Sequence, residues 1–341
     1  MTGFLAEYGM FLLKAVTIVA AVVVVLTAVA AAGRKATGRQ EGLEVESLNK
    51  KYRSLVANLK KVLLSKKDWK AAAKAEKSRS KSEARSAERR PRTFVIDFKG
   101  DLKATAVTSL REEVSAILAV ANEDDEVVAR LENFGGVVHE HGLGASQLAR
   151  LRERNIALTV VVDKVAASGG YLMACVANRI IAAPFAILGS IGVIAQLPNF
   201  NRLLDNHGID FEQITAGEYK RTVTMFGTNT DEDRAKLKQE LDDIHELFKA
   251  VVGKYRPNLD LAKVATGEHW YGSRALELGL ADEIGTSDEL LSRLAKKREV
   301  YSVCYRVKQP LQKKLLAHVD GVLDTVDASG WRRRFETRLP R

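Results

Sequence analysis

Ser168 lies in a turn of the kind that can hold a nucleophile. The run Val165-Ala-Ala-Ser-Gly-Gly-Tyr-Leu-Met-Ala174 follows a predicted strand and opens a predicted short apolar helix. At such a turn the helix dipole and the free N–H groups of the first helical turn favour negative charge developing near the serine oxygen. Gly169 lets a substrate approach the backbone, and its N–H can face an oxyanion. The motif alone fits a catalytic serine, and it equally fits a serine that only caps the helix.

A serine nucleophile needs a base, and Lys220 is the candidate that the sequence offers. It lies in Gly217-Glu-Tyr-Lys-Arg-Thr222, after a run at 211–215 that predicts a strand. Lysine acts as a general base where burial disfavours its ammonium form. The turn Gly135-Gly136, which follows a predicted strand at 127–131, supplies further N–H groups for an oxyanion hole. Taken by itself, Lys220 also fits a solvated surface lysine.

The other chemistry-bearing patterns are weak. His139 and His141 are spaced like two metal ligands on one face of a strand, but no third ligand is evident, so polar residues in a loop are the simpler interpretation. His245-Glu246 begins like a zinc-protease motif, but lysine stands at position 249 where histidine is needed. Gly189-Ser-Ile-Gly192 lacks the spacing of a dinucleotide fingerprint. We therefore expect neither a metal nor a cofactor.

Five stretches taken together are far more specific than the serine motif alone. They are Val161–Tyr171, Ala183–Val193, Pro198–Arg202, Ala216–Thr222 and Ala265–Gly272. In them the chain resembles the signal peptide peptidase A family of serine–lysine membrane peptidases. The resemblance implies that Ser168 is the nucleophile, Lys220 the general base and Ser190 the hydroxyl that orients the lysine. It also implies that the Gly135 and Gly169 amides form the oxyanion hole.

The same resemblance implies a ClpP/crotonase-like α/β spiral and assembly into rings. The serine and lysine motifs occur once each, so a neighbouring subunit is expected to supply Lys220 to Ser168. A monomer with both residues in one subunit is the alternative. The chain departs from the family at Asn133-Phe134-Gly135-Gly136, where proline usually precedes the glycines. Phenylalanine leaves φ free, so this turn is expected to be less constrained.

Two functions follow as hypotheses. The first is a membrane-anchored serine endopeptidase that hydrolyses unfolded or membrane-derived peptides with a Ser168–Lys220 dyad. The second is a catalytically weak or inactive membrane scaffold that binds peptides or a partner complex, and Phe134 and the long basic segment before the domain motivate it.

A membrane anchor is expected within residues 1–33. The run 15–32 carries no charge, and about 20 apolar residues cross a bilayer as a helix. A cleaved signal peptide is the alternative, but the run is long for one and no basic region precedes it. Basic residues follow the run at Arg34, Lys35 and Arg39. The positive-inside rule therefore places the following domain in the cytoplasm of a bacterial cell, behind a single inner-membrane span, whereas the family resemblance favours the periplasm.

The segment 34–92 is a basic linker. It holds 19 Lys and Arg against 7 Asp and Glu, so the rest of the chain is nearly neutral and no nucleic-acid-binding face is expected. Residues 41–92 are predicted to be helical and mostly solvated. An apolar stripe from Leu48 to Leu64 fits either a coiled-coil arm or a helix lying on the bilayer. Residues 66–92 are expected to be a solvated linker that is attracted to anionic headgroups.

Strand and helix patterns alternate over residues 93–298, which predicts an α/β peptidase domain. Continuous apolar runs indicate parallel strands buried on both faces. Strands are expected at 93–98, 127–131, 158–163, 179–183, 186–190 and 300–304, and helices at 108–122, 143–154, 168–178, 199–208, 230–255, 273–280 and 287–296. Residues 299–341 add the last strand, an amphipathic helix at 309–326 and a basic tail. Cys175 and Cys304 both lie among apolar residues and are expected to be buried thiols.

Overall fold

The computed structural model describes residues 9–10, 12–21, 41–85 and 90–307. The chain divides into two compact units, residues 1–42 with 306–341, and residues 43–305. In the first unit, residues 9–10 and 12–21 are helical. Most of the predicted span at 15–32, the predicted helix at 309–326 and the basic tail lie outside the described residues. No helix in the described ranges is long and apolar enough to cross a membrane.

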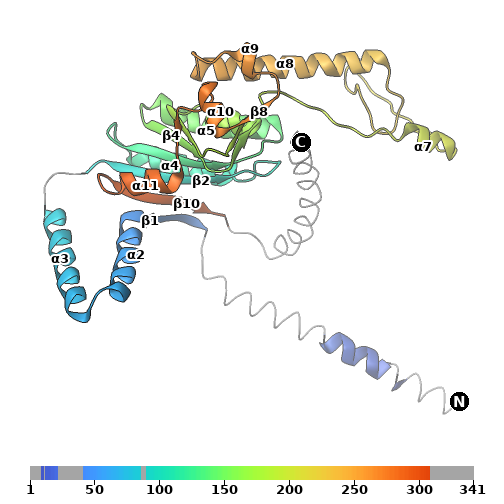
Figure 1. Ribbon diagram of the computed structural model, residues 1–341. Coiled ribbons are helices and arrows are strands. Elements are labelled where there is room, and N and C mark those ends of the chain that lie inside the picture. The colour runs from blue at the N-terminus through green and yellow to red at the C-terminus, as the bar shows by residue number, and fades with distance from the viewer. Residues whose placement is uncertain (1–8, 11, 22–40, 86–89, 308–341) are drawn as a thin grey trace, which may run out of the picture. The chain divides into compact units, whose positions relative to one another are not determined.

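A seven-stranded sheet forms the centre of the larger unit (Figure 1). In order across the sheet, its strands are β1 (Gly42–Ser47), β10 (Glu299–Arg306), β2 (Arg92–Lys99), β3 (Glu126–Glu132), β4 (Ala157–Val162), β6 (Arg179–Ala182) and β9 (Glu283–Ile284). From β10 to β9 every neighbouring pair is parallel. The predicted α/β class with parallel strands is confirmed.

Helices cover both faces of this sheet, with α4, α5 and α6 on one face and α11 with the start of α2 on the other. The helices of the described residues are α2 (Leu48–Leu63), α3 (Lys66–Arg85), α4 (Val107–Val120), α5 (Val138–Glu153), α6 (Gly169–Ala174), α7 (Asn201–Asn206), α8 (Asp231–Tyr255), α9 (Leu261–Val264), α10 (Gly272–Glu277) and α11 (Ser287–Leu294). On β2, Phe94 and Ile96 belong to the cluster formed with α4, α5 and α6. Val95 points to the opposite face, in the cluster with Leu290 and Leu291 of α11. Because both faces are buried, the strands carry continuous apolar runs.

A second, three-stranded sheet carries the serine motifs. It consists of β5 (Val165–Ala167), β7 (Ile187–Gly189) and β8 (His269–Tyr271). β5 and β7 are parallel, so their carboxyl ends lie together. A bridge between Asn133 and Ala166 joins this sheet to the end of β3. The sheet therefore places the ends of β3, β5 and β7 next to one another.

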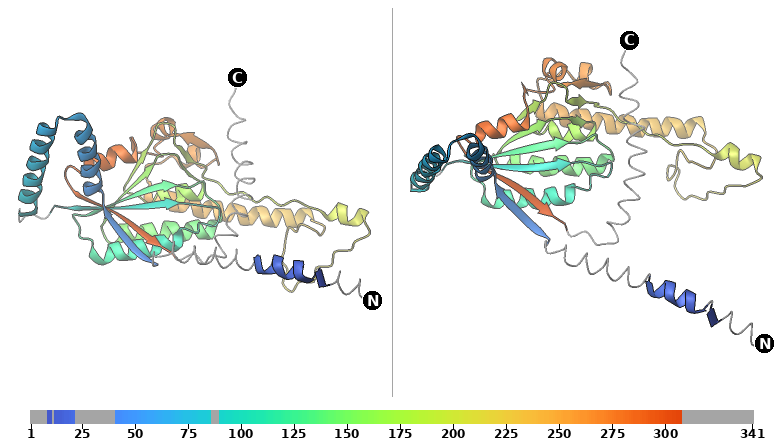
Figure 2. Two further views of the ribbon diagram at one scale, coloured as in Figure 1. Left: turned by 90° about the horizontal axis from the view of Figure 1, so that it is seen from below. Right: turned by 60° about the horizontal axis from the view of Figure 1, so that its bottom comes forward.

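The helix α8 lies against α6 and then continues past the core. A capping box between Thr230 and Asp233 begins it. Its C-terminal half contributes Phe248 and Val252 to the core. Its N-terminal half and the segment containing α7 extend beyond the sheet (Figures 1 and 2). We call residues 194–230 the arm. Its large apolar side chains are exposed, with Ile214 at 94%.

The structure corrects four expectations. Residues 42–47 form the strand β1 rather than a helix, whereas residues 66–85 form the helix α3, in agreement with the helical prediction for 41–92. Residues 211–215 have no strand, because they lie in the exposed arm with no neighbouring strand among the described residues. His139 and His141 lie on the helix α5, not in a loop. Cys304 is exposed, because it points outward from β10, whereas Cys175 is buried as expected.

Candidate active site

Ser168 stands between β5 and α6 in a strained backbone conformation. Its φ is +53°, a region that residues other than glycine rarely adopt. Its N–H donates to Gly189 O at 2.8 Å, and its own carbonyl accepts from Leu172 N–H at 2.9 Å. The first bond ties Ser168 to the end of β7 and the second begins α6. The surrounding bonds thus hold a sharp turn that leaves the side chain partly exposed, and strain of this kind concentrates at functional sites.

Gly135 and Gly169 must be glycine because the backbone is crowded at both positions. Gly135 has φ +89°, and a Cβ atom there would lie 2.7 Å from Ser168 Cβ and 2.8 Å from Gly169 N. A Cβ atom at Gly169 would lie 2.5 Å from Cγ of His141. The turn after β3 is therefore packed directly against the turn that carries Ser168, as the oxyanion-hole expectation requires.

The amide of Gly135 is already bonded. Its N–H donates to Oδ1 of Asn133 at 2.9 Å, which closes a turn across Phe134. By contrast, Gly136 and Gly169 both line the cavity that Ser168 faces. Gly169 is the first residue of α6, so its N–H has no partner within that helix. Of the two amides expected from the sequence, Gly169 is open to a ligand and Gly135 is held by a neighbouring side chain.

Asn133 and His141 are site residues that the sequence did not reveal. Both side chains are fully buried. Nε2 of His141 lies 3.2 Å from Asn133 Oδ1, and Nδ1 of the same ring lies 2.9 Å from Val137 O. The carbonyl of Asn133 accepts from Ala167 N–H at 3.0 Å. Only the spacing of the two histidines was visible in sequence, and nothing local indicated that the second ring turns inward against the glycine turns.

Ser190 occupies an equivalent turn at the end of β7. Its φ is also +53°, and its N–H donates to Glu268 O at 2.6 Å. Because Ser168 bonds the preceding residue, Gly189, the two serines leave parallel strands at the same edge. The structure therefore brings Ser190 into the neighbourhood of Ser168, while its expected role in orienting Lys220 stays a prediction.

Lys220 does not join this group within one chain. It lies in the arm in a turn whose bond runs from its N–H to Gly217 O at 3.2 Å. Its side chain is exposed, and it is absent from the described residues that line the cavity beside Ser168. The neighbouring Tyr219 ring receives Lys236 of α8 at 4.9 Å from its centroid. One copy of the chain thus contains a formed serine turn and a separate lysine.

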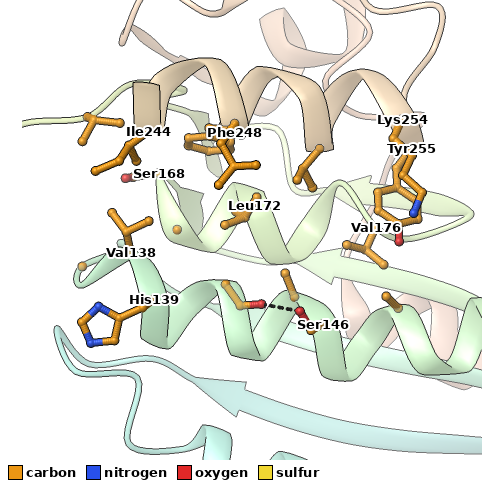
Figure 3. A pocket seen from close by; sticks show the side chains of 18 of the residues that line it. Val138, His139, Ser146, Ser168, Leu172, Val176, Ile244, Phe248, Lys254 and Tyr255 are labelled. Atoms are coloured by element: carbon orange, nitrogen blue, oxygen red, sulfur yellow. Dashed lines mark hydrogen bonds between the residues drawn. The ribbon is translucent and has the colours of Figure 1, made fainter. Parts of the chain in front are cut away.

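An apolar cavity of about 570 Å³ begins at Ser168 and runs between α8 and the pair α5 and α6 (Figure 3). Small residues on α5, at Gly142, Ala145 and Ala149, leave room for it. Leu172 and Phe248 face each other across it. Its far end holds Lys254 and Tyr255. The shape suits an extended segment with apolar side chains, which would pass Ser168 at one end.

A thiol nucleophile at the neighbouring Cys175 does not compete with Ser168. Burial raises the pKa of the Cys175 thiol to about 12, so the reactive thiolate is strongly disfavoured. Its Sγ donates to Leu172 O at 3.2 Å inside the core. Among the residues that the structure describes, no cluster of three or more His, Cys, Asp or Glu side chains is placed to hold a metal ion.

Comparisons with known proteins agree on one family. Residues 3–148 match the family model described as Peptidase family S49 N-terminal, and residues 150–301 match the one described as Peptidase family S49. A probable protease SohB of Haemophilus influenzae is 46% identical over 322 residues, 91% of each chain. A putative signal peptide peptidase SppA of Enterococcus faecium is 28% identical over 177 residues, 51% of each chain. A solved mutant of the 1510-N membrane-bound stomatin-specific protease, in complex with a substrate peptide, aligns with a TM-score of 0.41 and 12% identity, over 67% of this chain and 98% of its own.

Proposed function

The chain belongs to peptidase family S49, as its motifs predicted, and is a probable protease; on this premise we propose that it is a membrane-anchored serine endopeptidase with a Ser168–Lys220 dyad and a ClpP/crotonase-like fold. The observation that carries the proposal is the strained Ser168 turn, packed between two glycine turns at the end of an apolar cavity. Such a turn costs about 1–3 kcal/mol. A serine with only a structural role would not explain why the protein keeps this strained conformation.

The proposed chemistry uses only side chains and backbone amides. Neutral Lys220 takes the proton of Ser168 Oγ, which attacks the peptide carbonyl carbon to form a tetrahedral oxyanion. Lys220 then protonates the leaving amine as the C–N bond breaks. Water, losing a proton to Lys220, attacks the acyl-enzyme and releases Ser168. The hydroxyl of Ser190 accepts or donates a hydrogen bond that orients the lysine.

The oxyanion requires two N–H donors, and the two glycine turns are their proposed source. Gly169 N–H is available at the helix terminus. The second donor comes from the turn Gly135-Gly136. Gly135 N–H has to leave Asn133 Oδ1 before it can bind an oxyanion, whereas Gly136 already lines the cavity. We expect Gly136 N–H to be the second donor while Gly135 stays bonded to Asn133.

A neighbouring subunit supplies Lys220 in this proposal, within a homo-oligomeric ring. The exposure of Lys220 and of the apolar side chains of the arm supports it, because both need a covering surface. Burial in a subunit interface would also disfavour the lysine ammonium form, which a general base requires. The site would then be complete only in the assembled protein.

A serine-directed fluorophosphonate tests the proposal on the full chain in membranes. We expect Ser168 to be labelled in the wild type, and labelling to disappear in Ser168→Ala and in Lys220→Ala. Absence of labelling in the wild type at every pH would favour the second candidate, a peptide-binding membrane scaffold, for which the engaged Gly135 amide is the supporting observation.

The substrate and the membrane side complete the proposal. The apolar cavity lining supports unfolded or membrane-derived peptides as substrates.

The excess of Lys and Arg after the apolar N-terminal run supports a cytoplasmic domain behind a single inner-membrane span. Reporter fusions joined after residue 92 test the second point, since alkaline phosphatase activity there would place the domain in the periplasm instead.

A further inference from the structure

The helix α2 carries an apolar stripe that is buried at its start and uncovered further along. Leu48 and Tyr52 pack with the core cluster on the α11 face of the sheet. The stripe continues through Leu55, Leu59 and Val62, whose side chains are 58%, 62% and 82% exposed. Figures 1 and 2 show α2 and α3 side by side, projecting away from the sheet. The start of the stripe is therefore held by the domain and the rest is exposed.

The first turn of α2 is bound firmly enough to fix the direction of that stripe. The side-chain amide of Asn49 donates to Ala295 O at 2.9 Å and to Arg298 O at 3.0 Å. Its Oδ1 accepts from Val300 N–H at 2.7 Å. Ser47 Oγ accepts from Lys50 N–H at the helix cap. The exposed stripe thus belongs to a helix anchored on α11 and β10.

The charge of α2 and α3 indicates which kind of surface the exposed stripe contacts. Residues 48–63 hold five Lys and Arg and no Asp or Glu, and residues 66–76 add four lysines against two acidic residues. A second copy of α2 would place like charges along the seam, where a coiled coil needs opposite ones. An anionic lipid surface offers both an apolar layer and compensating charge. We propose that α2, with α3 beside it, lies on an anionic bilayer with Leu55, Leu59 and Val62 at the headgroup boundary.

A cavity beside the stripe supports this choice. It measures about 690 Å³ and lies between α2, α3 and α11. Its lining combines the aromatic Tyr52 and Trp69 with the cationic Lys60 and Lys296. Aromatic and basic side chains gather where membranes meet water. The hairpin therefore carries aromatic and basic side chains between its helices, in addition to the exposed stripe of α2.

Depth-dependent fluorescence quenching tests the proposal on the full chain. An N-terminal span would hold every variant at the bilayer to the same extent, so differences in quenching report on the labelled position itself. A bimane label is placed by Val62→Cys in a Cys304→Ser background, and a control label by Glu232→Cys on α8. Vesicles contain phosphatidylcholine alone or with phosphatidylglycerol, plus a lipid with a nitroxide on its acyl chain. We expect strong quenching of the Val62 label only with phosphatidylglycerol, weakened by high salt, and none of the control label.

Charge reversal provides the matched comparison. Lys60→Glu/Lys61→Glu should weaken the interaction about ten-fold or more, since each lysine near an anionic surface contributes about 1 kcal/mol. Lys236→Glu/Lys238→Glu on α8 changes the net charge equally and should leave quenching intact. Quenching of the Val62 label that does not depend on the charge of the lipid would overturn the proposal. So would disulfide cross-linking between two Val62→Cys copies that does not depend on lipid, which would make α2 an interface between subunits.

A second inference rests on different residues and depends on the proposed function. We infer that Asn133 and His141 are positioning residues that hold the two glycine turns together. Asn133 Oδ1 accepts from Gly135 N–H, and a Cβ atom at Gly170 would lie 2.2 Å from Asn133 O. The His141 ring lies against Gly169. The pair thus contacts both turns, and supplies a constraint where the family usually has proline before the glycines.

The orientation of the pair follows from its donors and acceptors. Oδ1 of Asn133 accepts from the Gly135 N–H and also faces Nε2 of His141; since Val137 O faces Nδ1, a neutral ring donates to one of these two oxygens and an imidazolium to both. The Nδ1 side of the ring faces a second acceptor, Val137 O. The imidazole therefore spans from the first turn of α5 to the oxyanion turn, and removing it frees the Asn133 side chain to rotate.

Kinetics separate positioning from simple packing. His141→Leu and Asn133→Ala should lower kcat for a peptide substrate about ten- to a hundred-fold with little change in KM, since losing one full oxyanion donor costs 10²–10³. His141→Gln, whose amide can still donate, should recover part of kcat. Leu110→Met, a volume-conserving change in the core on α4, should leave kcat unchanged.

The controls distinguish the two levels of the hypothesis. If the wild type is inactive and Ser168 unlabelled, the proposed function fails. If the wild type is active and His141→Leu keeps its kcat at an unchanged melting temperature, the positioning role fails while the peptidase stands. If His141→Gln is as impaired as His141→Leu, the hydrogen bond is not what positions the turn.

Discussion

The surroundings of Ser168 and the arm that carries Lys220 are built in opposite ways. Around Ser168 the side chains of Asn133, His141 and Tyr171 are fully buried, and glycines bring three turns into direct contact. In the arm, residues 194–230 expose their large apolar side chains. The first region is complete in a single chain. The second lacks such packing, so in our proposal one half of the site is preformed and the other half depends on assembly.

The largest expected effect comes from separating the two halves. Ser168→Ala and Lys220→Ala should each lower peptidase activity by ~10³-fold or more, because nucleophile and base act as a unit. Mixing the two inactive proteins under conditions that exchange subunits should restore part of the activity, measured on an unfolded peptide. Co-purified mixed assemblies that remain inactive would show that both residues act within one subunit.

A matched pair of glycines compares the regions directly. Gly135 and Gly217 both have positive φ, but a Cβ atom at Gly135 meets Ser168 while one at Gly217 meets nothing within 4 Å. Gly135→Ala should reduce kcat by about 10²-fold or more, because the oxyanion turn must shift. Gly217→Ala should cost only about 1 kcal/mol of local strain. Equal losses of kcat in the two variants would contradict the preformed character of the serine region.

The free energy of unfolding should also depend on the protonation of a buried acid in the core. Burial raises the pKa of Glu113 on α4 from 4.5 to about 7, while its Oε1 accepts from Tyr305 N–H at 2.8 Å. The folded state favours the protonated acid, so stability is full below pH 4.5 and declines as pH rises through about 7. Glu113→Gln should therefore be more stable than the wild type by about 2–3 kcal/mol at pH 8 and equal to it at pH 4.5. Melting curves at the two pH values measure this; equal stabilities at pH 8 would contradict it.

The smallest effect tests the arm without touching the dyad. Ile214→Asp changes a side chain that is 94% exposed, so the melting temperature of the unassembled chain should not move. If the arm packs on a neighbouring subunit, the charge should weaken assembly and lower activity about ten-fold at low protein concentration. Activity that recovers with concentration, followed by light scattering, is the expected result. Full activity at every concentration would mean that Ile214 lies outside the interface.

Local patterns were sufficient for the interior of the fold. The β-branched run at 158–163 predicted β4, and the spaced leucines and cap at 230–255 predicted α8, because buried strands and amphipathic helices carry their own periodicity. The serine turn was also visible, since glycines at fixed positions after a strand indicate a sharp turn. The alternation Leu43-Glu-Val-Glu46 was a strand signal as well, and a period of two could have identified β1.

Contacts between distant residues decided the rest. The apolar run at 211–215 looks like a core strand, but a strand needs a neighbouring strand, and the part of the chain that the structure describes provides none beside the arm. His141 became a buried partner of Asn133 only because α5 packs over the turn after β3. The sequence by itself determined which residue types stand at Ser168, Ser190, Lys220 and the glycine turns. Which of them meet was decided by the tertiary structure, because side chains far apart in the chain come together only where the packing of strands and helices brings their turns to one edge.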